Sequence, residues 1–238
     1  DPEVPVGFER APVSCSGFIS LVDQARKRGE LYLGRETINV LPCPREGEAV
    51  LNCTRVGRLD GTDARDLTTA EVEARRQAMS VVAFAARRLP GFERAKLVAI
   101  APSIGVRETR RIVGEYVLTS EDVIGGRRFP DAVARSAYNI DIHNPDDDKS
   151  TWHEITDAYD IPYRCLVPKG IENLLVAGRC ISTTHEASGS VRMTPHVAAT
   201  GEAAGTAVAM AVRTGVTPRA LDVEALRAEL RSRNVDLE

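Results

Sequence analysis

Residues 172–212 read ENLLVAGRCISTTHEASGSVRMTPHVAATGEAAGTAVAMAV, and they carry the strongest pattern in the sequence. The nearly all-apolar run Asn173–Ala177 predicts a short buried strand, which Gly178 ends. About sixteen small and polar residues then form a predicted loop. A helix is expected to follow, with Thr194 as its N-cap and Pro195 at its first position, where a missing N–H costs nothing.

The helix predicted after Pro195 has almost no side-chain bulk, because alanine and glycine dominate it up to Val212. Glycine inside a helix costs about 0.5–1 kcal/mol relative to alanine. Gly201 and Gly205 therefore suggest that another group approaches this backbone closely. A strand, a glycine, a loop and a small-residue helix can present free N–H groups to an electron-rich ligand. The same pattern also fits a tightly packed αβ unit without a ligand, and pattern alone leaves both open.

The residues of this segment resemble the C-terminal motif of bacterial FAD-dependent oxidoreductases in the glutathione-reductase-like superfamily. The resemblance rests on NLLVAGRC, THEA, GS, R-M and AAGTA, and it extends upstream to IGVRETRRIVGEYVLTSEDV at residues 104–123. It implies that the predicted strand returns to a Rossmann-like flavin domain. It also implies that the following helix points its N-terminus at the pyrimidine edge of the isoalloxazine ring.

The resemblance implies FAD as cofactor, and it assigns a set of candidate cofactor-binding residues. These are Gly178, Arg179, His185, Gly189, Ser190, Arg192, Thr194, His196 and Gly201. Arg179 departs from better-known branches of the superfamily, where an acidic residue binds the ribityl hydroxyls; an arginine accepts no hydrogen bond but could reach a phosphate oxygen. No metal is expected, because His185 and His196 lack a neighbouring set of ligands at the usual spacing.

Two further groups are candidate catalytic residues. Arg107 and Arg111 belong to the crowded run RETRR and could bind an anion through forked, permanently charged contacts. A surface cluster of ion pairs would look the same in sequence. His143 alternates with Asp141 in the predicted strand IDIH, so that both project from one face. Histidine can donate or accept a proton near neutral pH, although a polar strand edge is the plainer interpretation.

Composition restricts the functional classes. The 238 residues carry a net charge of −3, with 43% hydrophobic and 27% charged residues. Nothing here favours binding to nucleic acid or to an anionic membrane. No apolar run approaches the roughly 18 residues of a spanning helix, and no secretory signal opens the sequence. Five cysteines without CxxC spacing predict reduced thiols in a cytoplasmic protein.

The sequence contains no strand followed by G-x-G-x-x-G, the loop that binds a dinucleotide pyrophosphate. We therefore expect the C-terminal half of a flavoenzyme, with the main FAD-binding half absent. Such a chain would act on a small organic molecule only together with that half, and alone would bind FAD weakly or not at all. Two alternatives stay open: a flavin-free binding or scaffold module, and a subunit that completes a flavin site with a partner chain.

The expected fold class is α/β, or α+β for this chain alone. A mixed or antiparallel substrate-type domain would occupy residues 1–170, the FAD-domain segment residues 171–215, and a final helix and tail residues 216–238. Helices are predicted at 17–28, 68–89, from Thr119, shortly after Asp131, and at 221–230. Strands are predicted at 30–33, 37–41, 49–55, 96–101, 113–118 and 161–168. A capping box, Thr68 with Glu71, marks the start of the second of these helices.

Overall fold

The computed structural model describes residues 14–143 and 150–237, and these form two compact units. Of the described residues, 14–105 belong to unit 1, and 106–143 and 150–237 belong to unit 2. Each unit has its own hydrophobic core.

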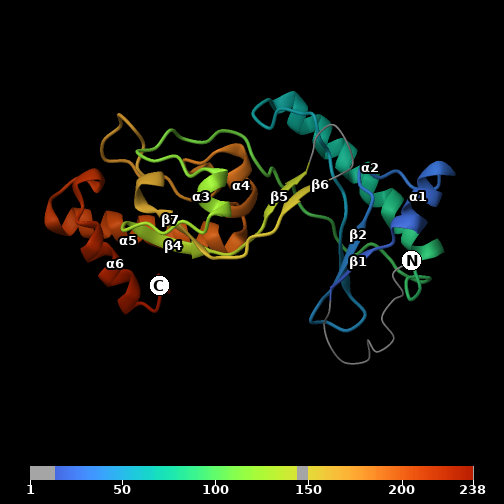
Figure 1. Ribbon diagram of the computed structural model, residues 1–238. Helices are drawn as coiled ribbons and strands as arrows, with labels where there is room; N and C mark the ends of the chain where they lie inside the picture. The colour runs from blue at the N-terminus through green and yellow to red at the C-terminus, as the bar shows by residue number, and fades with distance from the viewer. Residues whose placement is uncertain (1–13, 144–149, 238) are drawn as a thin grey trace. The chain divides into compact units, whose positions relative to one another are not determined.

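Unit 1 combines a small antiparallel sheet with two helices (Figure 1). Its elements are β1 (Cys15–Gly17), α1 (Ile19–Lys27), β2 (Ile38–Pro42), β3 (Ala49–Asn52) and α2 (Ala64–Arg88). Strand β2 is the central strand and pairs with both others, and β2 and β3 confirm the strands predicted at 37–41 and 49–55. The core is built mainly from Val22 and Ala25 of α1, Ile38 of β2, and Phe84 and Ala85 of α2.

Helix α2 begins four residues earlier than predicted. Asp63 is the N-cap, and its carboxylate accepts from the N–H groups of Arg65 and Asp66. Thr68 therefore lies inside the helix, where its hydroxyl donates to the carbonyl of Ala64, and the predicted capping box is wrong. Aspartate competes well with threonine at an N-cap, so the earlier residue determines where the helix starts.

Unit 2 contains four helices and two two-stranded antiparallel sheets in its described residues. The helices are α3 (Ser120–Ile124), α4 (His185–Val191), α5 (Thr194–Thr214) and α6 (Val223–Ser232). The strands are β4 (Ala132–Ser136), β5 (Ile140–His143), β6 (Ser150–His153) and β7 (Tyr159–Pro162). Strand β4 pairs with β7, and β5 pairs with β6.

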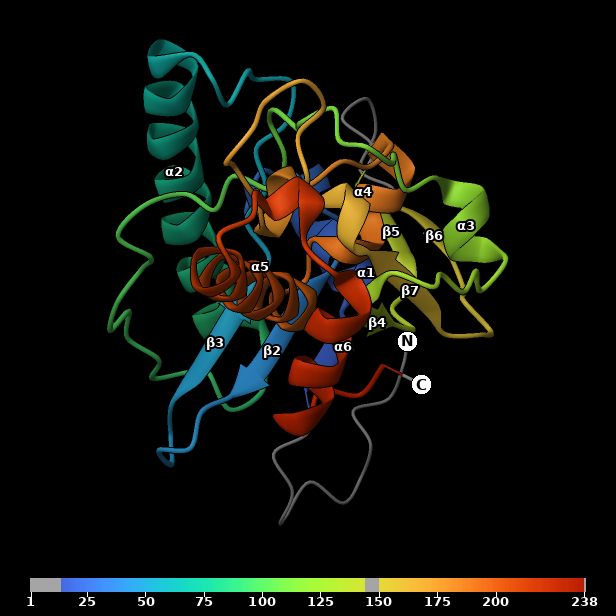
Figure 2. The same ribbon diagram turned by 90° about the vertical axis from the view of Figure 1, so that its left-hand side faces the viewer.

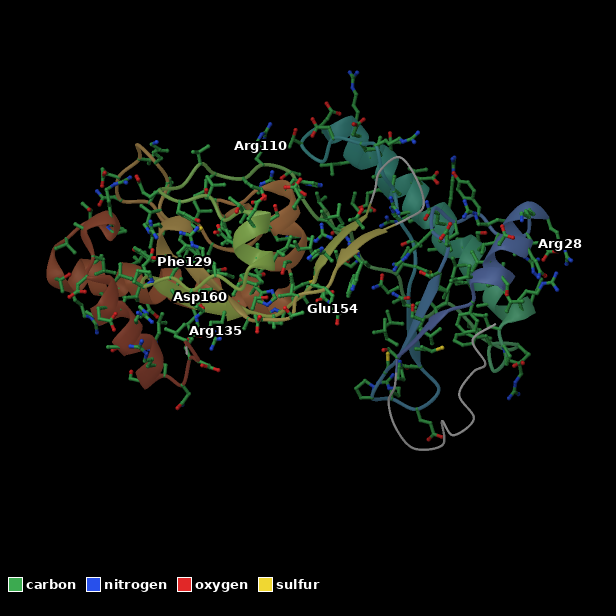
Figure 3. The ribbon with its side chains drawn as sticks, viewed as in Figure 1. Arg28, Arg110, Phe129, Arg135, Glu154 and Asp160 are labelled. Carbon is green, nitrogen blue, oxygen red and sulfur yellow. The ribbon has the colours of Figure 1, made fainter. Side chains whose placement is uncertain are left out.

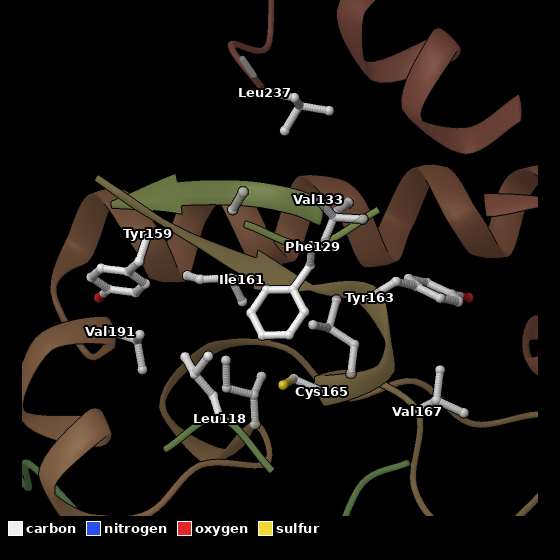
Figure 4. Close-up of a cluster of buried hydrophobic side chains, with 14 of the residues drawn as sticks. Leu118, Phe129, Val133, Tyr159, Ile161, Tyr163, Cys165, Val167, Val191 and Leu237 are labelled. Carbon is white, nitrogen blue, oxygen red and sulfur yellow. The ribbon is translucent and has the colours of Figure 1, made fainter. Parts of the chain in front are cut away.

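The small-residue helix α5 packs along β4, and α6 lies beside α5 (Figures 1 and 2). Ala203, Ala207 and Ala211 form the buried side of α5, so the helix can approach the sheet closely. On the other face of the sheet, Phe129, Tyr159, Ile161 and further side chains form the core of the unit (Figure 4). The long small-residue helix expected after Pro195 is confirmed.

A buried carboxylate holds the sheet of unit 2 to the preceding chain. Asp160 of β7 accepts hydrogen bonds from the backbone N–H of Phe129 at 2.9 Å and from Nε of Arg128 at 3.1 Å. Nε of Arg135 on β4 lies 3.5 Å from the second carboxylate oxygen. Figure 3 shows Phe129, Arg135 and Asp160 together at this sheet. Because the Asp160 side chain is only 2% exposed, these partners compensate a charge that burial would otherwise penalise.

Four predicted strands are wrong. Segments 30–33, 96–101, 113–118 and 173–177 contain no strand in the structure. Segment 113–118 comes nearest, because it makes two isolated bridges, between Gly114 and Pro168 and between Leu118 and Thr183. Segment 96–101 is exposed, with Val98 at 83%. A strand needs a continuous hydrogen-bonded neighbour, and an apolar run does not supply one.

Two segments of unit 2 form a strand or a helix where the sequence analysis predicted something else. The short helix expected after Asp131 is instead strand β4, whose residues Ala132, Val133 and Ala134 are all buried against the core and α5. The predicted loop before Thr194 contains helix α4, which Thr184 caps by accepting from the N–H of Ala187. The strand expected at 161–168 extends only over β7 and then turns into a 3₁₀ helix. The α/β fold class itself is confirmed.

Candidate functional site

The first turn of α5 borders an open cavity of about 510 Å³. Its lining residues are Ala137, Tyr138, Met193, Thr194, Pro195 and His196. Met193 is the N-cap, which places Thr194 at the first helical position rather than at the cap, one residue away from the prediction. The first N–H groups of a helix have no intrahelical partner and carry its positive dipole end. The cavity therefore has a wall that favours electron-rich groups.

His196 adds a buried polar group to this wall. Its residue is 8% exposed, and Nδ1 has no hydrogen-bond partner in the described structure. Burial lowers the pKa of the imidazole, and a hydrogen bond to the backbone of Ser190 opposes that shift. The ring therefore stays neutral at neutral pH, and Nδ1 is the atom left to accept a hydrogen bond. Tyr138 packs edge-to-face on the ring, with centroids 6.3 Å apart.

The turn at Gly178 connects the preceding chain to α5. Gly178 has a φ of 86°, a conformation that favours glycine, and its N–H donates to Oγ1 of Thr200 at 3.1 Å. The next residue, Arg179, is exposed and donates to the carbonyl of Val106. This contact brings Arg179 to the start of the segment that contains Arg107.

Arg107 and Arg192 meet at Asp141 of β5. Nη1 of Arg107 lies 3.7 Å and Nη2 of Arg192 lies 4.0 Å from the same carboxylate oxygen. Arg192 also donates to the carbonyl of Asp141 at 2.5 Å. Burial lowers the pKa of the Arg192 guanidinium, and the positive charges of Arg107 and Arg179 act in the same direction. Three arginines from three segments are therefore close enough to influence one another around one carboxylate.

Gly189 and Ser190 of α4 support this arrangement. A Cβ on Gly189 would lie 3.0 Å from Cγ1 of Ile142 and 3.2 Å from the carbonyl oxygen of Asp141, so α4 and β5 touch through the glycine. The Ser190 hydroxyl donates to the carbonyl of Tyr138 and also bonds the Tyr159 hydroxyl. Gly189 thus packs α4 against β5, and Ser190 bonds α4 to Tyr138 and to β7, although the sequence named both as candidate cofactor contacts.

Arg111 and His185 form a separate group around Glu108. The guanidinium of Arg111 pairs with Glu108 and donates through Nε to the carbonyl of Thr183 at 3.0 Å. Nδ1 of His185 lies 2.8 Å from Oε2 of Glu108. Arg111 and His185 thus form an ion-pair group within the protein, as a structural role would require.

Two other candidates lie apart from these groups or cannot be described in full. Gly201 is exposed on α5, and no atom of the described chain would lie within 4 Å of a Cβ built on it. His143 is the last residue of β5, which confirms the strand predicted at IDIH. The side chain of His143 lies outside the described part of the structure.

The sequence did not identify Tyr138 and Met193 as site residues. Tyr138 lines the cavity, packs on His196 and acts electrostatically on Arg192. Its position two residues before the polar strand IDIH was the available signal. Met193 lies between two candidate residues, but its role as N-cap depends on a backbone conformation that no side-chain preference indicates.

Residues 14–143 and 150–237 contain no group of three or more His, Cys, Asp or Glu side chains arranged to hold a metal ion. None of the helices described there is long and apolar enough to cross a membrane.

The chain was compared with protein families, curated proteins and solved structures. No curated protein and no solved structure matches it. The family model described as FAD dependent oxidoreductase matches residues 10–230, nearly the whole chain, and confirms this part of the expected relationship. The chain belongs to the FAD dependent oxidoreductase family.

Proposed function

We propose that this chain provides the flavin-ring side of an FAD site in an enzyme that oxidises or reduces a small organic molecule. The observation that carries the proposal is the cavity at the start of α5, which His196 lines while its buried Nδ1 has no hydrogen-bond partner among the described residues. Family membership supports FAD as the group that this cavity serves.

The residues of the cavity fit the pyrimidine edge of the isoalloxazine ring. That edge presents carbonyl oxygens and an N–H group, which need donors and an acceptor respectively. The free N–H groups of the first turn of α5 supply donors, and Nδ1 of His196 supplies an acceptor. Tyr138 and Met193 supply apolar surface for the ring.

Bound FAD would supply the electron-transfer chemistry, and the helix would stabilise the charge that reduction brings. The N-terminus of α5 carries roughly half an elementary positive charge, which favours an electron-rich neighbour. Thr194, Pro195 and His196 would hold the ring edge there. Gly178 and Thr200 would fix the turn before it.

Other parts of the FAD molecule require contacts that the sequence does not provide. The chain lacks the glycine-rich loop that binds a pyrophosphate. We infer that a Rossmann-like half of the glutathione-reductase-like type supplies it, within a cytoplasmic bacterial enzyme. In that arrangement residues 1–170 would form the substrate-type domain, residues 171–215 the flavin-domain segment and residues 216–238 the tail. Arg179, which donates to the carbonyl of Val106 in this chain, would reach a phosphate oxygen only in the complete FAD site.

Titration with three flavins tests the proposal. Lumiflavin contains only the ring, whereas FMN adds a phosphate and FAD adds a complete dinucleotide. We expect all three to bind weakly and with similar Kd values, because the chain recognises the ring alone. Flavin fluorescence quenching measures this directly. Stoichiometric, tight FAD binding would show that the chain recognises the dinucleotide as well and would contradict the inferred second half.

One variant tests the role of His196. His196→Phe keeps a buried ring but removes the acceptor, and loss of one neutral hydrogen bond should weaken lumiflavin binding about threefold to tenfold. His153→Phe is the matched control, because His153 is exposed on β6 and does not line the cavity. Unchanged lumiflavin affinity in His196→Phe would remove this residue from the flavin site.

A further inference from the structure

Among residues 14–143 and 150–237, more guanidinium groups than carboxylates lie around Asp141. Arg107 and Arg192 share one oxygen of Asp141, and Arg179 adds a third positive charge that acts on Arg192. Like charges at close range repel, and the repulsion is larger where water is excluded. Such a group of residues favours an additional anion.

Arg192 is the member of this group that most needs a further partner. Its side chain is only 8% exposed, and its Nε is buried without a hydrogen-bond partner in the described structure. Its contact with the Asp141 carboxylate, at 4.0 Å, is longer than a hydrogen bond. A buried charged donor that lacks an acceptor destabilises the folded protein, so this position favours an acceptor from a ligand.

The neighbouring group around Glu108 also contains a buried guanidinium nitrogen without a hydrogen-bond partner among the described residues, Nη1 of Arg111, but its charges are balanced. Arg111 pairs with Glu108 and also donates to a backbone carbonyl, and His185 bonds the same carboxylate. The positive charge of Arg111 is thus matched locally by Glu108. An excess of guanidinium groups is therefore a property of the Asp141 group and not of every arginine in this part of the sequence.

The Asp141 group adjoins the cavity at the start of α5. Tyr138 lines the cavity and acts electrostatically on Arg192, and Met193 follows Arg192 in the chain. A molecule whose anionic end meets the arginines can therefore place an uncharged body beside Tyr138.

We propose that Arg107 and Arg192 bind the carboxylate of a small organic acid, which is the substrate class of this enzyme. The assignment to a substrate rests on the proposed function, because the flavin ring would lie in the adjoining cavity. Two planar oxygens of a carboxylate match the fork of a guanidinium. A phosphate dianion fits less well, since the retained Asp141 carboxylate repels two negative charges more than one.

The test uses the flavin-free chain and the probe benzoate, with benzamide as a neutral probe of the same shape. Trp152 is the single tryptophan of the sequence and lies 6.4 Å from Tyr138 between ring centroids, so its fluorescence reports binding. We expect saturable binding of benzoate and at least about tenfold weaker binding of benzamide. Equal affinity for the two probes would overturn the proposal.

Three variants separate an anion site from a structural ion-pair group. Arg192→Gln should weaken benzoate binding about tenfold, and Arg107→Gln, which alters a half-exposed residue, about threefold. Asp141→Asn should strengthen binding, because it removes the competing carboxylate. If Arg192→Gln does not fold, Arg107→Gln and Asp141→Asn still test whether the group binds an anion. Unchanged affinity in Arg107→Gln or weaker binding in Asp141→Asn would overturn the proposal.

Arg164→Gln is the matched control. Arg164 forms a forked pair with Asp131 in the same unit and lies outside the Asp141 group. It should change the melting temperature but leave the Kd for benzoate unchanged, and an equal loss of binding in this variant would overturn the proposal.

Further probes distinguish a carboxylate ligand from a phosphate ligand, and they test the anion site separately from the proposed flavin site. Phenylphosphonate binding tighter than benzoate would overturn the carboxylate assignment in favour of a phosphate. Lumiflavin binding without benzoate binding would overturn this inference alone. Benzoate binding without lumiflavin binding would support the anion site and contradict the proposed flavin site.

Discussion

The two units bury a polar side chain in different ways. In unit 1, the amide of Gln77 on α2 accepts from the N–H of Arg55 at 2.9 Å and donates to its carbonyl at 2.8 Å. In unit 2, the carboxylate of Asp160 binds two arginine side chains and a backbone N–H. An amide satisfies a backbone donor and acceptor without charge, whereas a buried carboxylate depends on opposite charges nearby.

The long helices of the two units also differ on their outer faces. Helix α2 presents arginine and glutamate side chains, some of which pair with each other, as Arg75 does with Glu71. Helix α5 instead exposes Gly201, Gly205, Val208 and Val212, the last at 77%. An exposed small and apolar helix face permits close packing by another surface, whereas a charged face favours water. Helix α2 also exposes Val72 and Met79, but these lie among charged side chains, whereas the exposed face of α5 is mostly small and apolar.

Asp160→Asn should produce the largest effect on this comparison. Loss of the buried charge leaves Arg128 and Arg135 without their common carboxylate, and we expect the free energy of unfolding to fall by about 3 kcal/mol. Hydrogen exchange should rise in peptides from unit 2 and much less in peptides from unit 1. Asp131→Asn is the control, because Asp131 is 13% exposed and its partner Arg164 is half-exposed, and it should cost clearly less. Equal exchange in both units would show that they do not unfold separately.

Gln77→Ala should have a smaller effect, confined to unit 1. Two backbone groups of Arg55 lose their partner, which costs about 1–3 kcal/mol of unfolding free energy. Urea denaturation followed by hydrogen exchange would measure the loss and assign it to peptides of residues 14–105. Gln24→Ala, at an exposed position of α1, should stay within about 0.5 kcal/mol of the native protein. A loss as large as that of Asp160→Asn would remove the distinction between amide and carboxylate.

Gly201→Ala should stabilise this chain by about 0.5–1 kcal/mol, since alanine favours the helix and nothing in the described chain lies within 4 Å of the new Cβ. Thermal unfolding measures the gain. Gly201→Val tests the proposed close approach by a cofactor or another surface, because its extra bulk should weaken flavin binding in the complete enzyme. If Gly201→Ala lowers stability, the outer face of α5 is covered already.

The smallest effect is expected from the titration of His196. Burial lowers its pKa in the folded state below the ordinary value of 6.5. The unfolded chain therefore binds the proton first as pH falls, and the stability that comes from the neutral ring is lost between 6.5 and the lower folded-state pKa. His196→Phe should show a shallower loss of unfolding free energy between pH 7.5 and about pH 5. Parallel curves would mean that the folded protein does not disfavour the charged ring.

Local signals in the sequence predicted the helices better than the strands. Thr119 with Asp122 predicted the start of α3, and the structure contains that capping box. Pro90 and Gly91 predicted the end of α2. Strands depend on partners distant in sequence, so the apolar run at 96–101 was misjudged while β4, with its arginine and serine, was missed. Helix ends are set by neighbours in sequence, and sheets are not.

For the site, the sequence indicated residue types but not their pairing. Arg107 and Arg111 are four positions apart in one charged run, yet one contacts Asp141 and the other Glu108. The composition of the run contains no information on this choice, which depends on where β5 and Thr183 lie. His196 was named because of its place at a helix start, and its burial against Tyr138 follows only from the fold.

Gly189 restricts which sequences can keep the Asp141 group intact. A Cβ at this position would lie 3.0 Å from Ile142 and 3.2 Å from the carbonyl oxygen of Asp141, so either these groups or α4 must shift by a few tenths of an ångström. Arg192 follows directly after α4, so a shift of the helix would lengthen its hydrogen bond to the Asp141 carbonyl. Gly189 has no side chain, yet a substitution at this position would change where the Arg192 guanidinium lies at the proposed anion site. We therefore expect relatives that keep an arginine at position 192 to keep the glycine at position 189 as well.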